Sequence, residues 1–432
     1  MKLWDKKGSD INAQIEKFTV GRDPEFDMVL AKYDVQGSMA HAKMLESVNM
    51  LSAEDAKAIQ KELENIESEI KQGKFHIETG VEDIHSQIEL NLTKKIGEAG
   101  KRIHSGRSRN DQVAVDIKLF LRAEIQELKS EVKNLFDLLI FLSNQYKDDL
   151  LPGYTHLQIA MPSSFGLWFG AYAESLIDDL EMLSAAYQVV NKNPLGSGAG
   201  YGSSFPLNRK LTTELLGFNS LHYNVVYAQM SRGKTEKLVS FGMASIAATL
   251  SRLAMDACLY MNQNFGFISF PDELTTGSSI MPHKKNPDVF ELIRAKSNRI
   301  QSIPNELSFL MNNLPSGYHR DMQLTKEILF PAIEDLKNCI SMTVLMLSHV
   351  QVRKGILQDE KYKYLFSVEA VNELANQGVP FREAYKTIGN QINNDEFAFD
   401  QSKKLKHTHE GSLGNLNLPE ISQEMEKVLT KF

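Results

Sequence analysis

The sequence predicts an all-α protein built around a bundle of long helices. Apolar residues recur at steps of three and four over long stretches, no stretch alternates apolar and polar residues with a period of two, and Pro/Gly-rich breaks separate the long stretches. With 432 residues, 42% of them hydrophobic, the chain can bury a large core. We expect an N-terminal helical domain over residues 1–106, a central long-helix bundle over 107–352 and a small C-terminal helical domain over 353–432.

The helical spacing is clearest in four stretches, residues 117–142, 172–190, 239–260 and 333–347. Such spacing keeps one apolar stripe of each helix facing a partner helix. Around residues 244–257 the side chains are apolar or small on nearly every side. This helix is therefore expected to be buried all round, in a large core or between subunits.

Composition excludes several classes of protein. A net charge of −7 argues against a general nucleic-acid binder. The first ten residues, MKLWDKKGSD, lack the apolar core of a signal peptide, and the longest plain apolar run, 138–142, is too short to span a bilayer. Cys258 and Cys339 lie in apolar stretches, which indicates buried, reduced thiols. We expect a cytoplasmic protein with neither nucleic acid nor membrane as a partner.

The most informative polar segment is TGSSIMPHKKNPDV, residues 276–289. Asn286, Pro287 and Asp288 are expected to be the N-cap, first-turn proline and first-turn acid of a new helix. A helix N-terminus beside Lys284 and Lys285 is suited to binding an anion. From composition alone, a lysine-rich surface loop is the favoured interpretation.

The order of residues in this segment resembles the GSSxMPxKxNP signature of the fumarase/aspartase superfamily. The resemblance implies that Ser278 is the catalytic base and that Lys284 and Asn286 hold the substrate carboxylate. Removing a proton next to a carboxylate creates additional negative charge. Fixed cations and amide donors stabilise that charge more than they stabilise the ground state.

Two further blocks, HSGRSRNDQVA (104–114) and LPGYTHLQIAMP (151–162), resemble those of the argininosuccinate lyase family, and the likeness extends to residues 32–45 and 81–89. It spans most of residues 30–330. The resemblance implies a three-domain fold whose central helices form a multi-helix core in a homotetramer, with active sites shared between subunits. It also implies cleavage of argininosuccinate to arginine and fumarate.

The resemblance assigns roles to individual residues. Ser108, Arg109 and Asn110 are expected to face substrate carboxylates, which a guanidinium can bind with two parallel hydrogen bonds. A basic helix start is the plainer reading of this block. Thr155 is expected to contact the substrate, and His156 is the candidate general acid because imidazole titrates near neutral pH.

Further positions match the family one by one. Glu291 is expected to pair with His156, although a helix-surface carboxylate is the plainer interpretation. The arginine-like end of the substrate would be held by Tyr318, Gln323 and Lys326, which could equally be exposed polar residues. Asp27 keeps the family's register near the N-terminus.

Some positions depart from the family pattern. His283 replaces the usual glutamine, as in adenylosuccinate lyases, and the segment SRGKT (231–235) shifts a typical substrate-contacting arginine to Arg232 or removes it. Adenylosuccinate lyase-type cleavage and a non-catalytic, crystallin-like structural relative therefore remain as alternatives. No cofactor is expected, and no metal, since the histidines lack ligand spacing. The glycine-rich residues 196–204 are expected to connect two helices tightly and to line the pocket.

Overall fold

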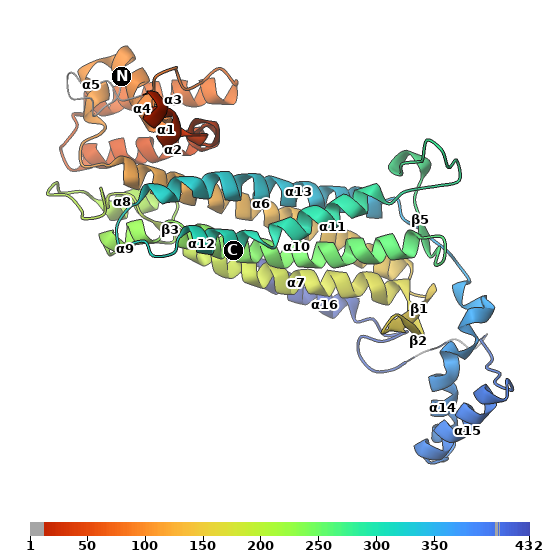
Figure 1. The fold of residues 1–432 in the computed structure, drawn as a ribbon. Coiled ribbons are helices and arrows are strands. Elements are labelled where there is room, and N and C mark those ends of the chain that lie inside the picture. The colour runs from red at the N-terminus through yellow and green to blue at the C-terminus, as the bar shows by residue number, and fades with distance from the viewer. Residues whose placement is uncertain (1–12, 402–404, 406) are drawn as a thin grey trace.

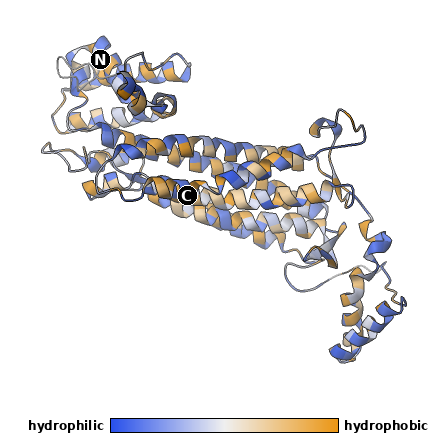
Figure 2. Ribbon diagram, in the orientation of Figure 1, coloured by the Kyte–Doolittle hydropathy of each residue, from blue (hydrophilic) through white to orange (hydrophobic). Residues whose placement is uncertain are grey.

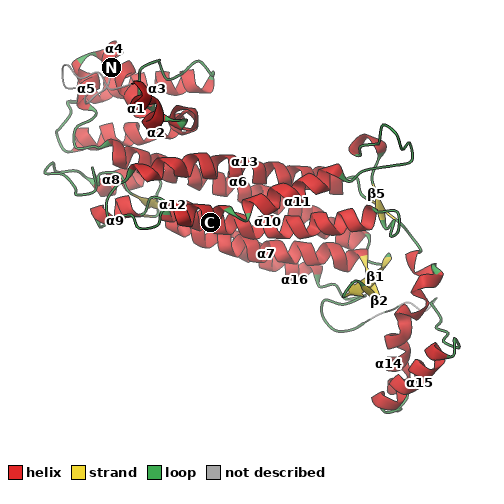
Figure 3. Ribbon diagram, in the orientation of Figure 1, coloured by secondary structure: helices red, strands yellow, loops and turns green. Residues whose placement is uncertain are grey.

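The computed structural model describes residues 13–401, 405 and 407–432, and helices dominate it (Figure 3). The predicted all-α fold class is confirmed. The first ten residues, for which the sequence predicted no signal peptide, lie outside the described part of the chain.

Four long helices lie side by side in the centre of the molecule (Figure 1). Each of the four predicted periodic stretches lies within one of them, and α7 contacts both α6 and α10 while α13 packs on α6. The 37 residues of α6 give it a length of about 55 Å. The bounds are α6 (Arg109–Gln145), α7 (Phe165–Val190), α10 (Lys234–Met261) and α13 (Thr325–Leu347).

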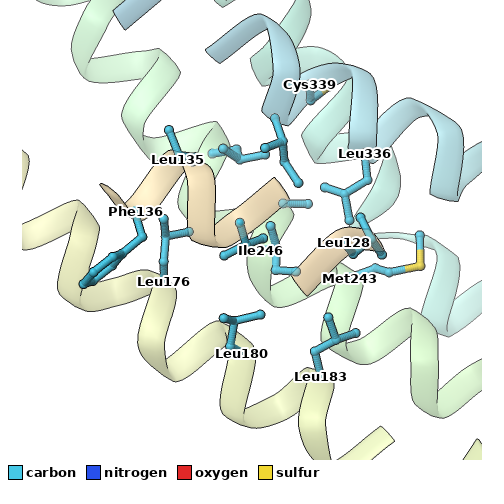
Figure 4. Packing of buried hydrophobic residues seen from close by; sticks show 14 of the residues in the cluster. Leu128, Leu135, Phe136, Leu176, Leu180, Leu183, Met243, Ile246, Leu336 and Cys339 are labelled. Carbon is cyan, nitrogen blue, oxygen red and sulfur yellow. The ribbon is translucent and has the colours of Figure 1, made fainter. Parts of the chain in front are cut away.

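The core of this bundle consists of aliphatic side chains that the four helices direct toward one another (Figure 4). Leu135 of α6, Leu180 of α7 and Ile246 of α10 are fully buried within it. Each such side chain contributes about 1.5–3 kcal/mol on burial. In Figure 2, hydrophobic and hydrophilic residues alternate along the bundle helices, as expected for helices with one buried side. Cys339 is buried and Cys258 partly buried, and both are free thiols, as predicted.

An N-terminal group of helices sits at the end of the bundle where α6 begins (Figure 1). It has a separate apolar cluster, and two of its helices begin at side-chain caps: Ser52 accepts from Asp55 N at the start of α3, and Asp83 accepts from Ser86 N at the start of α4. The bounds are α1 (Ala13–Val20), α2 (Asp23–Ser47), α3 (Ala53–Lys71), α4 (Ile84–Ile96) and α5 (Glu98–Arg102).

The C-terminal part forms a third apolar cluster at the opposite end, except that α16 returns to pack on α7 and α6. The predicted domain boundaries near residues 106 and 352 stay predictions. The C-terminal helices are η3 (Ile356–Gln358), η4 (Glu360–Phe366), α14 (Ser367–Asn376), α15 (Phe381–Asn393) and α16 (Leu418–Leu429). The connecting helices are α8 (Arg209–Leu215), α9 (Val225–Met230), η1 (Asp272–Leu274), α11 (Asp288–Ile300), α12 (Ile303–Leu310) and η2 (Arg320–Leu324).

Short strand pairs join some of the connections, and the sequence analysis missed them. Strands of two to seven residues are too short to show a period of two. The pairs are β1 (Leu150–Thr155) with β2 (Gln158–Ser164), antiparallel, β3 (Lys192–Asn193) with β4 (Ser220–Leu221), parallel, and β5 (Ile268–Ser269) with β6 (Gln351–Val352), antiparallel.

Within the described residues, α10 alone is long and apolar enough to match a membrane span by length and composition. Half of that apolar window is buried inside the bundle, where α10 packs on α7 and α11. Within one chain α10 is a core helix with one exposed face, so the expectation that residues 244–257 are buried all round stays a prediction.

A charged residue, Lys118, lies buried in this core with 2% of its surface exposed. Its ammonium donates only long hydrogen bonds, 3.3 Å to the Val189 carbonyl and 3.4 Å to the Thr235 hydroxyl. Burial lowers the pKa of Lys118 to about 7, although Glu236 acts in the opposite direction. Because the unfolded chain holds this proton more tightly, the cost of Lys118 to folding is largest below pH 7 and shrinks as pH rises toward 10.

We expect Lys118→Met to raise the free energy of unfolding at pH 6 by about 1–4 kcal/mol, because it removes a poorly paired buried cation. The gain should be smaller at pH 9, where the native lysine is largely neutral. Urea denaturation of both proteins at the two pH values measures the difference. A gain that does not change with pH would contradict the assigned titration.

Candidate active site

The candidate residues fall into three groups within one chain. The Arg109 group lies where the N-terminal helices meet the bundle, and consists of Asp27, Ser108, Arg109, Asn110, Tyr318, Gln323 and Lys326. The β1–β2 hairpin carries Thr155 and His156. The Ser278 loop, residues 275–287 before α11, carries Ser278, Lys284 and Asn286, and Glu291 follows on α11.

The RSRND block forms the N-cap and first turn of α6. The Ser108 hydroxyl accepts from Asn110 N at 3.3 Å, and the Asp111 carboxylate accepts from Ser108 N at 2.8 Å, which together make a capping box. The positive end of the helix dipole therefore lies at Ser108, Arg109 and Asn110, where an anion is stabilised.

Two carboxylates hold the Arg109 side chain. Its Nε lies 2.6 Å from Asp83 Oδ2 and its Nη1 2.9 Å from Glu82 Oε1, while Arg320 binds the same Glu82 oxygen at 3.1 Å. Burial alone would lower the pKa of the Arg109 guanidinium, but Asp83 and Glu82 raise it. Sequence reasoning noted residues 81–89 as family-like without assigning Glu82, Asp83 or Arg320 a role.

Lys326 and Asp27, predicted separately, are in contact. The buried Lys326 ammonium lies 2.5 Å from Asp27 Oδ1 and 2.6 Å from Asp23 Oδ1. Burial and then the charge of Asp27 raise the pKa of Asp23, whereas Lys326 and Arg109 act to lower it. The structure thus brings Lys326, Asp27 and Arg109 into one electrostatic cluster.

Gln323 and Tyr318 lie on the segment that leads into α13. The Gln323 amide donates to the Thr19 and Val20 carbonyls at 3.1 Å each, and so ties this segment to the end of α1. Tyr318 is half-buried and close enough to Arg109 to contribute to the raised pKa of the guanidinium.

The glycine-rich connection docks onto the start of α6. Asp111 Oδ2 accepts from Gly196 N at 2.9 Å and from Gly198 N at 3.0 Å. Both glycines have positive φ, 83° and 60°, which lets their amides turn toward the carboxylate. Burial raises the pKa of Asp111 to about 6 in spite of these hydrogen bonds. Residues 196–204 therefore lie beside the Arg109 group, as a connection between helices.

His156 and Leu157 form the two-residue turn of the hairpin, between Thr155 and its partner Gln158. Their φ values of 53° and 58° are left-handed, as in a type I′ turn, for which Asn-Gly is the preferred sequence. Both side chains are exposed in one chain, Leu157 by 80%. The turn thus presents the imidazole away from the bundle.

The Ser278 loop is closed at its base and donates hydrogen bonds to the serine. Asn286 N donates to the Thr276 carbonyl at 2.8 Å. The Ser278 hydroxyl oxygen accepts from Ile280 N at 3.3 Å and Met281 N at 3.2 Å. Two amide donors directed at one hydroxyl oxygen stabilise its ionised form.

The other candidates in and after the Ser278 loop are exposed. Lys284 and Glu291 both lie on the surface of one chain, and Ile280 is 82% exposed beside them. Within the described residues, no hydrogen bond or ion pair joins Glu291 to His156. Their predicted pairing therefore stays a prediction.

The N-cap predicted for α11 is wrong by one residue. Pro287 occupies the N-cap position and has no capping hydrogen bond, while Asp288 begins the helix. The Asn286 amide instead donates to Gly277 O at 3.2 Å and to the Thr276 hydroxyl at 3.3 Å. Asn286 thus closes the loop rather than capping the helix, because its side chain points back to Thr276 and Gly277 at the start of the loop.

In this conformation the Arg232 side chain is not free to contact a substrate in the way of the family's usual arginine. It is buried, with its Nε 3.2 Å from Glu236 Oε1 and its Nη2 3.4 Å from the Met322 carbonyl. A side chain at Gly233 would meet Met311, whose Cε lies 2.3 Å from an added Cβ. Position 233 therefore has no room for an arginine without movement of Met311.

Within one chain the bundle keeps the Arg109 group apart from the hairpin and from the Ser278 loop. Arg109 begins α6 and the hairpin follows its end, so about 55 Å of helix separates Arg109 from His156. The 23 residues of α13 similarly place about 35 Å between Lys326 and the β5–β6 pair that precedes the Ser278 loop. One chain does not bring the Arg109 group together with His156 or Ser278.

Comparison with known proteins identifies the class. The chain matches the family described as Lyase over residues 14–302. The argininosuccinate lyase of Bacteroides thetaiotaomicron is 58% identical over 431 residues, which covers 100% of this chain and 96% of that protein. That of Thermotoga neapolitana is 38% identical over 395 residues, 91% of this chain and 99% of that protein. The protein is thus a carbon–nitrogen lyase.

Solved structures agree on the fold. An EDDS lyase variant with bound fumarate has a TM-score of 0.79 at 20% identity and covers 98% of this chain and 91% of its own. A fumarate lyase:delta crystallin from Brucella melitensis has a TM-score of 0.74 at 15% identity, with 99% and 94% covered. Taken with the sequence matches, the chain belongs to the argininosuccinate lyase family, and the sequence-based assignment is confirmed.

The left-handed conformation of His156 can be tested by its effect on stability, independently of any catalytic role of the imidazole. We expect His156→Asn to keep the thermal stability, because asparagine tolerates this conformation, while His156→Val should lose about 1–2 kcal/mol. Thermal and urea unfolding of both variants measure this. Equal stability of the two would contradict the left-handed turn.

Proposed function

We propose that this lyase reversibly cleaves 2-(Nω-L-arginino)succinate to L-arginine and fumarate in arginine biosynthesis, at an active site to which several subunits of a homotetramer contribute. Full-length identity of 58% to argininosuccinate lyases is the observation that carries the reaction. All three sequence blocks that resemble the family are present in the chain. We expect the enzyme to act in the cytoplasm without a cofactor.

Ser278 is proposed as the base. Its oxygen takes the proton from the succinyl carbon beside a carboxylate, and the electrons of that C–H bond pass into the carboxylate as an aci-carboxylate. The two amides that donate to Ser278 Oγ support this role, since they lower the cost of the alkoxide. Lys284 and Asn286 are proposed to hold the carboxylate that gains charge.

His156 is proposed as the acid. When the C–N bond breaks and the C=C bond of fumarate forms, the guanidine nitrogen leaves with the bond electrons and takes a proton from the imidazole. Glu291 is proposed to support the protonated form of His156. Thr155 would contact the substrate beside it.

The Arg109 group is proposed to bind the two ends of the substrate. Ser108, Arg109 and Asn110 would hold the succinyl carboxylates at the α6 N-terminus, where the helix dipole favours anions. The arginine-like end is assigned to the remaining members of the group, Asp27, Tyr318, Gln323 and Lys326.

Shared sites follow from the length of the helices. Proton removal and proton delivery require base, acid and carboxylate ligands within hydrogen-bond reach of one substrate. One chain keeps the Arg109 group apart from Ser278 and His156 by the length of a bundle helix, so at least a second chain is proposed to supply the missing groups.

The outer face of α10 supports a multi-helix core between subunits. Phe241, Ala248 and Met255 recur at seven-residue spacing on this face, and Phe241 and Met255 are 43% and 41% exposed in one chain. An apolar seam of this period is suited to knobs-into-holes packing with helices of other subunits.

Fumarate release tests the reaction. The purified protein is given argininosuccinate, adenylosuccinate, aspartate and malate in parallel, and fumarate is measured by absorbance. We expect release from argininosuccinate. Release from adenylosuccinate alone would make adenylosuccinate the substrate, the alternative that His283 favours. A well-folded protein that acts on none of the four compounds would favour the non-catalytic structural relative.

Ser278→Ala is expected to lower turnover by at least ~10²-fold with an unchanged fold, because the base is lost. Near-normal turnover would remove Ser278 from this role.

Subunit mixing tests the shared site. Ser278→Ala and His156→Asn proteins, each nearly inactive, should recover part of the wild-type activity after subunit exchange, because some sites then receive an intact serine and an intact histidine. Exchange is verified by native mass spectrometry of the mixed tetramers. No recovery despite exchange would contradict sharing between chains.

A further inference from the structure

Three buried titratable residues meet beneath the Arg109 group. Asp34 of α2, His85 of α4 and Asp116 of α6 are 2%, 5% and 1% exposed. They lie far apart in the sequence, and their ligand-type atoms all lie within 4.8 Å of one another. None of them has a part in the proposed reaction.

The three side chains form a connected but incompletely paired cluster. His85 Nδ1 is hydrogen-bonded to Asp34 Oδ2 and lies 3.6 Å from Asp116 Oδ2. Asp34 Oδ1 accepts from the Ser38 hydroxyl at 3.1 Å, and Arg107 donates to that hydroxyl at 2.9 Å. Among the described residues, His85 Nε2 and both Asp116 oxygens have no hydrogen-bond partner.

Carboxylates outnumber cations around the cluster. Asp27 and Asp34 face it from α2, Asp83 lies beside His85 at the start of α4, and Asp116 comes from α6. Arg107 is the nearby cation on the segment before α6. Since carboxylates predominate, at least one of these groups must hold a proton to limit repulsion.

The surroundings shift the pKa of each of the three groups in a definite direction. Burial, and then the charge of Asp34, raise the pKa of Asp116 well above its usual value. Burial alone would lower the pKa of His85, but Asp34 raises it, and His85 in turn lowers the pKa of Asp34 against the effect of burial. Burial thus favours the neutral form of Asp116, whereas the contact between His85 and Asp34 favours the charged form of each.

The cluster is joined to Arg109 through the first turn of α4. His85 lies on that turn, and Asp83, two residues earlier, both caps the helix and holds Arg109 Nε at 2.6 Å. Asp27, the partner of Lys326, accepts from Ile84 N at 3.5 Å on the same turn. A shift of this turn would move the carboxylates that orient Arg109.

We propose that Asp34, His85 and Asp116 are positioning residues that fix the first turn of α4 and so hold the Arg109 guanidinium in the geometry that binds a substrate carboxylate. The proposal rests on the proposed function, which gives Arg109 its role. It adds that substrate affinity depends on a buried cluster that never touches the substrate.

Affinity and its pH dependence test this. Asp34→Asn removes the counter-charge of His85 and should raise KM for argininosuccinate at least about tenfold with kcat changed less than about threefold. Asp116→Asn imitates the neutral carboxyl, so KM at pH 7 should stay within about twofold of wild type. In the wild type KM should rise as pH rises and the cluster loses its protons, and this rise should be shallower in Asp116→Asn, which has one proton fewer to lose.

Asp179→Asn is the matched control. Asp179 is a buried carboxyl of α7 that accepts from the Ser245 hydroxyl at 2.5 Å, away from the Arg109 group. Its loss should affect stability and leave KM and its pH profile unchanged. If Asp34→Asn does not yield folded protein, His85→Gln replaces it and is expected to raise KM in the same way.

Several results would overturn the proposal. These are an unchanged KM in Asp34→Asn or His85→Gln, an equal rise in Asp179→Asn, or an identical pH profile in Asp116→Asn. Metal analysis that finds one divalent ion per chain in the wild type and none in Asp116→Asn would also overturn it, because the cluster would then hold a cation. Wild-type protein that does not cleave argininosuccinate would instead refute the proposed function, so the two failures are distinguishable.

Discussion

The mutual burial of α6, α7, α10 and α13 is the constraint on which the rest of the structure depends. Their apolar seam accounts for most of the core, and each helix must stay continuous over many turns to maintain it. The candidate catalytic and binding residues lie at the two ends of the bundle. The same rigidity sets the distance between those ends, so chemistry that needs groups from both requires more than one chain.

At the end where α6 begins, two cations are each held by two carboxylates, Lys326 buried and Arg109 partly exposed. Lys326 lies between Asp23 and Asp27, and Arg109 between Glu82 and Asp83. Buried ion pairs contribute little to stability because desolvation offsets their attraction, but they fix geometry. Arg109 is oriented by two carboxylates before any ligand arrives, and under the proposed function a substrate carboxylate would meet a guanidinium that has little freedom left to lose.

The sequence predicted the parts of this fold that depend on periodicity. Helices α6, α7, α10 and α13 appear as unbroken runs with steps of three and four, because the side of each helix that faces its partners repeats regularly along the chain. The hairpin around His156 was missed, since its pairing needs only a few residues and leaves no period. The cluster of Asp34, His85 and Asp116 could not be predicted from one sequence, because it depends on how α2, α4 and α6 pack together. Motif order located the Ser278 loop, yet the cap of α11 was misplaced by one residue because Asn286 closes the loop with its side chain.

The turn at His156 and Leu157 carries the argument about assembly furthest. A left-handed conformation costs an ordinary side chain about 1–2 kcal/mol, and glycine or asparagine would avoid that cost. Leu157 is also mostly exposed in one chain, so it gains nothing there from burial. Strained turns of this kind cluster at functional sites, and the cost is offset where the imidazole serves chemistry and the leucine is covered by another surface. Both conditions are met if the hairpin reaches into a site completed by neighbouring subunits, which is also what the length of α6 requires.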